Sequence, residues 1–543
     1  MKRRMIEEKR KAVLVAVVCL LVTSKCVAQD VPHLRKQGNA TQLIVGGKPF
    51  LVRGGELGNS TASDLNYLAP VWQRLVKLNL NTVLVPFYWE LIEPEEGKFD
   101  FSLIDGVLQA ARKNSIKVIP LWFGTWKNSM STYVPGWVKT NQTRFPRSKD
   151  RAGNGIEILS PFSDATAKAD AAAFRAVMRH LREVDSRDQT VIMVQVENEI
   201  GMIPDSRDRS DAANRLYAGE VPAELMNYLS KNRETLVPEM RGRLTAAGNK
   251  TAGTWEQVFG PGPHTEDIFM AWYFAKYTSI VTAAGKAEYS IPMYVNAALI
   301  RPGYQPGQYS SGGPLPHTMD IWRAAAQQID LLAPDIYFPN FAEWCRRYDR
   351  SGNPFFIPEA GAFPALAVNL LYAVGQHNAI GVSPFAVESI EGKQAEDLTS
   401  VYDILSQLEP LLLANTGRGA TAGLLSEGPE QREPQRLVLN GYRLNITYDK
   451  AATGSMDMPL SGGLVLAEGP DQFVIAGTGL TITFETDSPG EPIVGLLSVE
   501  AGKYINGKWV GRRLNGDQTH QGRHVRLNAG KFEIQRVKLY RYR

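Results

Sequence analysis

The pattern that most constrains the fold is an alternation of short apolar segments with amphipathic helical stretches across residues 40–410. Amphipathic stretches such as 65–78, 104–113 and 165–184 separate apolar segments of strand length. These segments lie at 50–54, 82–88, 116–122, 191–196, 292–296, 331–337, 354–358 and 380–385. Strands that alternate with helices pair in parallel through helical crossovers. Eight such units predict an α/β fold of the closed (β/α)8 type, the TIM barrel.

The alternative is an open, doubly wound sheet, but no Gly-rich nucleotide loop follows the first strand. A barrel of about 370 residues exceeds the roughly 250 residues typical of this fold, so some loops must be long. Residues 201–290 are charged and rich in helix formers, which favours helical insertions over the active-site rim. Residues 301–317 are rich in Gly, Pro and Tyr and predict an irregular loop, placed at the catalytic face by the fifth strand.

The sequence pattern changes near residue 415. From 436 to 540, short segments of alternating polarity are separated by Gly, Asp and Asn turns. This pattern is typical of an all-β domain, and we expect a sandwich. The predicted organisation is therefore a barrel at 29–414 and an accessory β domain at 415–543. The accessory domain is either a binding module or a structural buttress for the barrel.

The N-terminus has the features of an export signal. Residues 2–11 are strongly basic, 12–22 form an unbroken apolar run, and Cys26-Val27-Ala28 supplies the small residues that signal peptidase prefers. We expect a signal peptide at 1–28, export to the periplasm or the medium, and no integral membrane span after cleavage. An uncleaved N-terminal anchor is the alternative. Eleven apolar residues are few for a bilayer core of about 30 Å.

Charge and cysteine content exclude other classes of protein. The whole chain has a net charge of +4, but residues 1–28 contain seven basic and two acidic residues, so the remainder is close to neutral. A body of this charge gives no reason to expect a nucleic-acid partner. Cys345 is the cysteine that remains after signal cleavage, so no internal disulfide is expected. The sequence has no HExxH motif and no Cys-His cluster, and we expect neither a metal nor a cofactor.

Two predicted strands end in carboxylates. The fourth strand ends in Glu197-Asn198-Glu199, and the seventh ends in Glu359. Residues at the carboxyl ends of barrel strands carry the chemistry of this fold. The pleat of a strand makes Glu197 and Glu199 face the same way unless the backbone turns, so spacing alone does not choose between them. The alternative is that these glutamates form salt bridges at the rim.

A pair of carboxyl groups across a barrel mouth suits glycoside hydrolysis. A retaining enzyme needs one carboxyl with a raised pKa to protonate the leaving oxygen. It needs a second, ionised carboxylate about 5 Å away to attack the anomeric carbon. The fourth and seventh strands lie across the predicted barrel from each other, so Glu359 and a strand-four glutamate could flank one sugar.

Several segments resemble glycoside hydrolase family 35, within the large barrel clan of retaining glycosidases. VQVENEIG at 194–201 is similar to its acid/base motif, and PEAG at 358–361 is similar to the clan's nucleophile strand. VPFYWELIEPEEGKFDF at 85–101 resembles its strand-two signature, and RGGEL at 53–57 resembles its strand-one segment. These segments occur in the family's order. The C-terminal β region resembles the accessory domain of bacterial members.

The resemblance implies roles for individual residues. Glu199 would be the acid/base, Glu359 the nucleophile, and Asn198 the partner of the sugar 2-hydroxyl. Tyr337, at the end of the sixth strand, would hydrogen-bond the nucleophile, although core packing is an alternative for its ring. The implied sugar contacts from the first two strands are Glu56, Tyr88, Trp89 and Glu90. The sequence departs from the family at Pro86, Glu90 and Ile92, which puts the galactose assignment in doubt more than the mechanism.

Two further residues are candidates from their chemistry. Trp122 follows the third strand, and indole rings stack on the C–H faces of sugars. Asn296 ends the fifth strand and would either bind a hydroxyl or cap the next turn. The resulting hypothesis is an exported, retaining exo-β-galactosidase that removes terminal galactose from oligosaccharides or polysaccharides. The alternatives are another exo-β-glycosidase of the clan and a non-catalytic carbohydrate-binding barrel.

Overall fold

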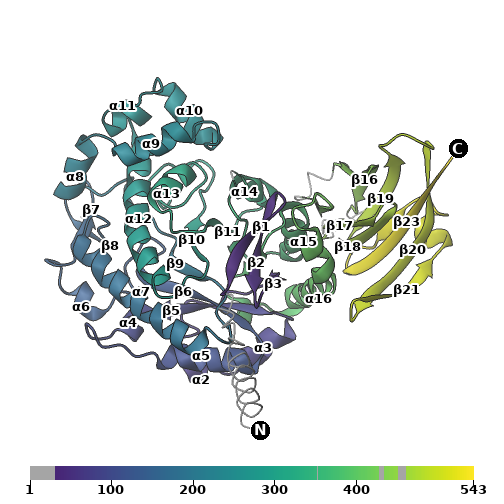
Figure 1. Cartoon of the computed structure of the whole chain (residues 1–543), viewed down its shortest axis with the longest axis horizontal. Coiled ribbons are helices and arrows are strands. Elements are labelled where there is room, and N and C mark those ends of the chain that lie inside the picture. Colours follow the sequence, from purple (N-terminus) through teal and green to yellow (C-terminus); the bar gives the residue numbers. More distant parts are fainter. Residues whose placement is uncertain (1–30, 351, 427–432, 451–459) are drawn as a thin grey trace, which may run out of the picture.

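The eight predicted barrel strands form one parallel sheet in the computed structural model, which describes residues 31–350, 352–426, 433–450 and 460–543 (Figure 1). The expected signal peptide at 1–28 lies outside the described residues. The strands are β4 (Val52–Arg53), β5 (Thr82–Tyr88), β6 (Lys117–Lys127), β9 (Val194–Asn198), β10 (Met293–Ala298), β11 (Leu331–Ile336), β12 (Ile357–Ala360) and β13 (Gly381–Pro384). Their order in the sheet is β4-β13-β12-β11-β10-β9-β6-β5.

The two end strands of this sheet also meet, so the barrel closes. The N–H of Leu84 in β5 donates to the carbonyl of Gly55 at 2.8 Å, and the N–H of Leu57 donates to the carbonyl of Leu84 at 3.0 Å. Glu56 and Leu84 form a parallel bridge between these bonds. The predicted (β/α)8 barrel is confirmed, and the open-sheet alternative is wrong because both edges of the sheet are paired.

Helices that bury one apolar face cover the outside of the barrel. They are α3 (Val71–Lys77), α5 (Ser102–Lys113), α7 (Asp164–Asp185), α12 (Pro263–Lys286), α13 (Met319–Ala325), α14 (Phe341–Tyr348), α15 (Leu366–His377) and α16 (Gly392–Asn415). In α5, for example, Ile104, Val107, Leu108 and Ala111 repeat at helical spacing and are all buried. The Ser163 hydroxyl caps α7 by accepting the N–H of Thr166 at 3.2 Å.

Short helices and strands lie around the barrel. The predicted insertion at 201–290 begins with four short helices before α12. A three-stranded antiparallel sheet precedes the barrel, and the sequence patterns did not predict it as a separate unit. The bounds are β1 (His33–Gln37), β2 (Ala40–Val45), β3 (Lys48–Phe50), α2 (Leu65–Leu68), α4 (Trp89–Ile92), α6 (Gly136–Lys139), β7 (Arg147–Lys149), β8 (Gly155–Leu159), α8 (Asp211–Ala218), α9 (Ala223–Lys231), α10 (Pro238–Ala246), α11 (Trp255–Phe259) and the 3-10 turn η1 (Val387–Ser389).

The C-terminal region is a sandwich of two antiparallel sheets, as predicted. One sheet has the order β14-β17-β18-β23-β20-β21 and the other β15-β16-β19-β22. Its elements are β14 (Thr421–Leu425), β15 (Gln435–Leu439), β16 (Tyr442–Tyr448), β17 (Gly462–Gly469), β18 (Gln472–Thr478), β19 (Leu480–Thr486), β20 (Ile493–Ile505), β21 (Lys508–Leu514), η2 (Gly516–Thr519), β22 (Val525–Leu527) and β23 (Glu533–Tyr542). The strands β14 and β21 were not predicted.

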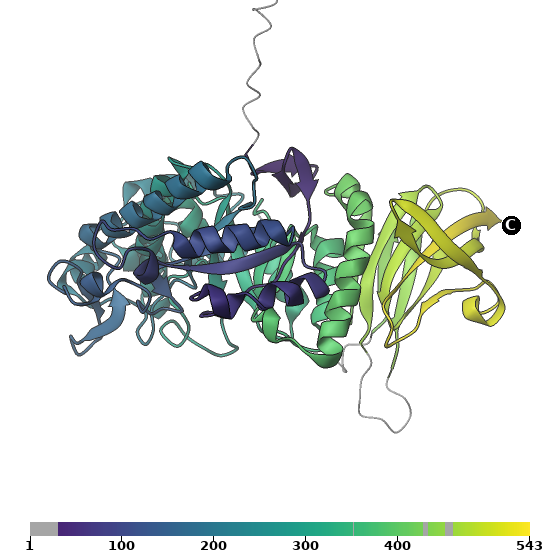
Figure 2. The same ribbon diagram turned by 90° about the horizontal axis from the view of Figure 1, so that it is seen from below.

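The sandwich packs directly on the last two barrel helices, which lie between it and the barrel in Figure 2. Leu464 and Val474, on the outer face of the larger sheet, belong to the same hydrophobic cluster as the barrel core. A Cβ on Gly375 of α15 would lie 2.7 Å from Leu464 Cβ, and one on Gly423 of β14 would lie 2.6 Å from the carbonyl of Tyr372. This close approach favours the buttress alternative for the accessory domain.

Within the part of the chain that the structure describes, no helix combines the length and the apolar character needed to cross a membrane.

Candidate active site

Three carboxyl groups from three barrel strands meet at the carboxyl end of the sheet. Glu199 follows β9, Asp335 lies on β11 and Glu359 lies on β12. One carboxylate oxygen from each lies within 4.8 Å of the others. All three residues are buried, with exposed fractions of 7%, 1% and 5%. The structure therefore brings together the two glutamates that the sequence singled out and adds Asp335, which it did not.

The backbone turns at the end of β9, and this turn decides which glutamate faces the site. Glu197 has a φ of +62° and Glu199 a φ of +45°, both in the left-handed region that side chains with a Cβ rarely adopt. Glu197 points away from the barrel mouth: it accepts the N–H of Trp126 of β6 at 2.7 Å and lies beside Asp170 of α7. Glu199 enters the barrel mouth. The alternative left open by the strand pleat is thus resolved in favour of Glu199.

Glu197 belongs to a closed polar cluster behind the barrel wall. Its partner Asp170 also accepts hydrogen bonds from Trp122 Nε1 at 2.8 Å and from the Thr125 hydroxyl at 2.7 Å. Burial and the charge of Asp170 raise the pKa of Glu197 well above its usual range. Glu197 therefore lies outside the barrel mouth, among buried groups of β6 and α7.

Asn296 fixes the backbone of Glu199. Its Oδ1 accepts the N–H of Glu199 at 2.9 Å, and its Nδ2 donates to Asp335 at 2.7 Å and to Asn198 Oδ1 at 3.3 Å. Asn198 also accepts from Gln195 Nε2 at 2.9 Å. Asn296 therefore links β9, β10 and β11 instead of capping a turn. The sequence predicted that both asparagines contact the sugar. To do so, Asn198 or Asn296 must exchange one of these hydrogen-bond partners for a sugar hydroxyl.

Tyr337 and Glu56 both contact Glu359. The Tyr337 hydroxyl donates to Glu359 Oε1, in the arrangement that the clan resemblance implied. Glu56, fully buried after β4, lies against Glu359 on another side. Burial and the charge of Glu199 raise the pKa of Glu359 to about 7, against the opposing effects of Lys127, Tyr337 and Glu56. Burial raises the pKa of Glu56 well above its usual range, so Glu56 is neutral.

Lys127, at the end of β6, provides the positive charge for this group, and the sequence analysis missed it. The side chain is buried, donates to Asn128 Oδ1 and lies 5.1 Å from the ring centroid of Phe123. Its charge lowers the pKa of Glu56, Glu199 and Glu359, although burial still leaves each of them raised. A charged residue directly after an apolar strand was the signal that would have identified it. We refer to Glu56, Lys127, Glu199, Asp335 and Glu359 as the carboxyl cluster.

The carboxyl cluster also has ligands that a hard divalent cation accepts. Glu199, Asp335 and Glu359 are close enough to share one ion. Lys127 already supplies positive charge to two of them. The expectation of a site without metal or cofactor stays a prediction.

The other residues expected to contact sugar lie away from the carboxyl cluster. Trp89 is fully buried and donates from Nε1 to Glu93 at 2.7 Å. Trp122 is 1% exposed, with its Nε1 bonded to Asp170, so its expected stacking on sugar is wrong because its faces are covered by core residues. Tyr88 is buried between Phe123 and Tyr133. Glu90 forms an ion pair with Lys139 at 3.2 Å. None of the four lines the cavity described next.

A cavity of about 580 Å³ opens onto Glu199, Asp335 and Tyr337. Its wall consists of residues at and just after the ends of β9, β10 and β11. The irregular loop predicted at 301–317 supplies Arg301, Tyr304 and the segment 308–310, so its expected place at the catalytic face is confirmed. The backbone of Met202 pairs with that of Ser311, with bonds of 2.9 and 3.1 Å, and joins the loops after β9 and β10.

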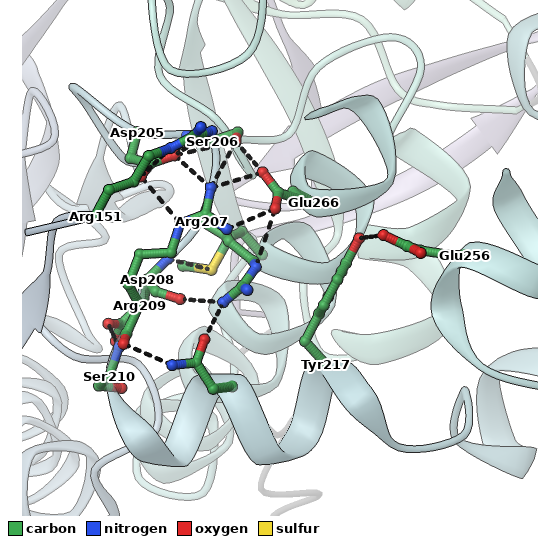
Figure 3. Close-up of polar contacts among 12 residues, drawn as sticks. Arg151, Asp205, Ser206, Arg207, Asp208, Arg209, Ser210, Tyr217, Glu256 and Glu266 are labelled. Atoms are coloured by element: carbon green, nitrogen blue, oxygen red, sulfur yellow. Dashed lines mark hydrogen bonds and ion pairs between the residues drawn. The ribbon is translucent and has the colours of Figure 1, made fainter. Parts of the chain in front are cut away.

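An ion-pair network holds the loop after β9 (Figure 3). Arg209 pairs with Asp205 at 2.7 Å and with Glu266 of α12 at 2.6 Å. Arg207 also pairs with Glu266, at 3.2 Å, and Arg151 pairs with Asp205 at 3.1 Å. Hydrogen bonds from these guanidinium groups lower the pKa of both acids despite their burial. We refer to these five residues as the arginine network.

Comparison with known proteins gives partial matches to β-galactosidases. A glycoside hydrolase 42 family model described as "Beta-galactosidase" matches residues 70–277. A model described as "Domain of unknown function (DUF5597)" matches residues 398–526 and so includes part of α16. A beta-galactosidase of Xanthomonas manihotis is 26% identical over 197 residues, which are 35% of this chain and 30% of that protein. The chain thus spans less than a third of this relative's length. The match is to a β-galactosidase domain of family 42 type, and not specifically to family 35.

Solved structures with a similar barrel have low sequence identity. The beta-galactosidase from Rahnella sp. R3 has a TM-score of 0.45 and 16% identity, covering 67% of this chain and 57% of that chain. The beta-galactosidase from Bacillus circulans sp. alkalophilus has a TM-score of 0.45 and 14% identity over the same shares. The catalytic domain of a beta-amylase from Paenibacillus polymyxa has a TM-score of 0.44 and 12% identity, covering 64% and 96%. Likenesses of this size support no inference about function.

Proposed function

We propose that the protein is a retaining exo-β-galactosidase that releases terminal galactose from oligosaccharides or polysaccharides through a covalent glycosyl-enzyme. The observation that carries this proposal is the approach of the Glu199 and Glu359 carboxyl groups to within 4.8 Å. Retaining enzymes place their two carboxyl groups about 5–5.5 Å apart, whereas inverting enzymes need about 6.5–9.5 Å to admit a water molecule.

The two glutamates have different partners, and these assign their roles. Glu359 accepts a hydrogen bond from the Tyr337 hydroxyl and lies against Glu56, and both neighbours favour its ionised form. Glu199 lies on the cavity wall, and burial raises its pKa, which favours retention of its proton. Glu199 gives this proton to the leaving oxygen while Glu359 attacks the anomeric carbon. Glu199 then takes a proton from water, which displaces Glu359 and releases the sugar.

The galactose specificity and the family assignment rest on separate support. The β-galactosidase family model and the Xanthomonas manihotis relative support galactose. The finer assignment to family 35 rests on the ordered segments 53–57, 85–101, 194–201 and 358–361. Export to the periplasm or the medium, proposed from the basic and apolar segments at 2–22, would bring the enzyme to large glycans.

A panel of aryl β-glycosides tests this function in wild type, Glu359→Ala and the surface variant Glu343→Ala. We expect wild type and Glu343→Ala to cleave the galactoside at the same rate. Glu359→Ala should lose at least about 10⁴-fold in kcat and regain turnover with azide, which replaces the missing nucleophile. Turnover of another sugar would keep the mechanism and overturn the specificity. Full activity of Glu359→Ala would overturn the mechanism.

A further inference from the structure

We propose that the cavity beside Glu199 selects a leaving group that carries an anionic substituent, and that Arg301 recognises this substituent. A carboxylate on a hexuronic acid and a sulfate ester on a sugar share the required chemistry. The inference rests on the proposed function and names the substrate class of that same site.

The position of the cavity assigns it to the leaving group. Its wall includes Glu199, the proposed proton donor, but not Glu359, the proposed nucleophile. The donor must touch the leaving oxygen, and the nucleophile must touch the sugar that is transferred. The cavity on the side of the proton donor therefore holds the leaving group. A volume of about 580 Å³ falls within the range of about 300–1,000 Å³ found for small-molecule sites.

Most ionisable groups in the wall are already engaged. Glu199 and Asp335 belong to the carboxyl cluster. The Tyr337 hydroxyl donates to Glu359, and the Tyr309 hydroxyl donates to Asp267 at 2.6 Å. These contacts leave Arg301 as the charged side chain of the wall that can serve a ligand.

Arg301 has no acidic partner among the described residues. Its guanidinium lies 5.9 Å from the ring centroid of Tyr304, which is 40% exposed. A turn fixes the two residues relative to each other, because the Tyr304 N–H donates to the Arg301 carbonyl at 3.1 Å. By contrast, each arginine of the nearby arginine network is paired with Asp205 or Glu266.

This geometry fits an acidic sugar. An arginine stays charged in proteins and binds a carboxylate or a sulfate through two parallel N–H bonds. The neighbouring Tyr304 ring presents an apolar surface to the C–H face of the same sugar. A neutral leaving group would leave the guanidinium solvated and would gain nothing from its charge.

Turnover of paired substrates tests the inference. The substrates are a β-galactosyl disaccharide with glucuronic acid as leaving sugar, the same disaccharide with glucose, one with glucose 6-sulfate, and 4-nitrophenyl β-galactoside. We expect wild type to prefer an acidic disaccharide over the glucose one by about tenfold in kcat/KM. Arg301→Met should remove this preference, so that its kcat/KM values for the acidic and the glucose disaccharides lie within about twofold of each other. The glucuronate and sulfate arms identify which anion is preferred. Arg144→Met, which removes a surface guanidinium paired with Glu96, is the control.

Binding of methyl β-glucuronide and methyl glucoside 6-sulfate to the full chain separates this inference from the proposed function. If galactosides are cleaved without any dependence on the anion or on Arg301, the inference is overturned and the function stands. If no galactoside is cleaved but an anionic glycoside binds at least about fivefold more weakly to Arg301→Met, the function fails and the anion site stands. Equal turnover and equal binding in wild type and Arg301→Met overturn the inference.

Discussion

The structure contains two groups of acids, the carboxyl cluster and the arginine network, whose pKa values are shifted in opposite directions. The carboxyl cluster gathers four carboxyl groups around one ammonium group, Lys127, and burial raises the pKa of each acid. The arginine network gathers two carboxylates among three guanidinium groups, and the pKa of both acids is lowered (Figure 3). The difference shows that the supply of cations, more than burial, decides whether an acid keeps its proton.

This contrast distinguishes acids that can take part in catalysis from acids that hold the structure in place. Acids that are fully paired by guanidinium groups are ionised at all working pH values and have no proton to give, so the arginine network can only hold the loop after β9 in place. Acids that share too little positive charge have raised pKa values, about 7 for Glu359, and general acid catalysis requires a group whose pKa lies near the working pH. The carboxyl cluster opens onto a cavity, whereas Glu197 and Asp170, which are equally short of cations, are enclosed between β9 and α7.

The largest expected effect comes from removing the ammonium group of the carboxyl cluster. In Lys127→Met we expect kcat/KM for a galactoside to fall by about 100-fold, because positive charge beside the reacting carboxylates is lost. Lys127 lowers the pKa of Glu359, so its removal raises that pKa further. The acidic limb of the kcat/KM profile, where Glu359 ionises, should move to higher pH.

Lys139→Met is the matched control, because Lys139 pairs with Glu90 outside the cavity. Its pH profile should coincide with that of wild type. If the acidic limb of Lys127→Met does not move and the variant is less stable, Lys127 has a structural role. That result would contradict the contrast drawn between the carboxyl cluster and the arginine network.

A smaller effect, on stability, is expected in the arginine network. Arg209→Met removes the ion pairs that Asp205 and Glu266 form with the Arg209 side chain, which is 14% exposed. We expect the free energy of unfolding at pH 7 to fall by about 3 kcal/mol. Asp205 has a lowered pKa in the folded state, so its ionised form stabilises the fold above the unfolded pKa of about 3.9, and this stabilisation is lost as pH falls. The difference from wild type in denaturant unfolding should therefore shrink below about pH 4.

Arg151→Met gives the smallest effect. Its side chain is 73% exposed, and a surface ion pair contributes about 0.5 kcal/mol. Equal losses for Arg151→Met and Arg209→Met, or a loss for Arg209→Met that is independent of pH, would contradict the role given to buried pairing.

The barrel could be predicted because its strands are apolar on both faces and alternate regularly with helices. The eight predicted segments all overlap a barrel strand, and Glu199 and Glu359 were identified because each follows a predicted apolar strand. The N-terminal sheet and the strands β14 and β21 escaped prediction. For example, β21 (KWVGRRL) is mostly exposed and lacks a clear alternation of polar and apolar residues.

Contacts between distant segments limited the prediction of the site. Trp122 ends the strand predicted at 116–122, which suggested a sugar-binding residue, but it lies within β6 and its direction depends on Asp170, which is 48 positions away. The choice between Glu197 and Glu199 depends on a positive φ angle at each of them. Glycine is the usual sequence signal of such an angle, and neither residue is a glycine. Lys127 and Asp335 can be identified as site residues only from the fold, which brings β6, β9, β11 and β12 together.

The central claim is that Glu359 forms a covalent bond to the sugar while Glu199 supplies the proton. An activated 2-deoxy-2-fluoro-β-galactoside slows hydrolysis of the intermediate and traps it, and mass spectrometry of the digested protein locates the label. We expect one fluorogalactosyl group per chain, attached to Glu359 within the peptide that contains β12. A label on Glu56 or Asp335, or turnover of galactosides with inversion and no label, would contradict the account.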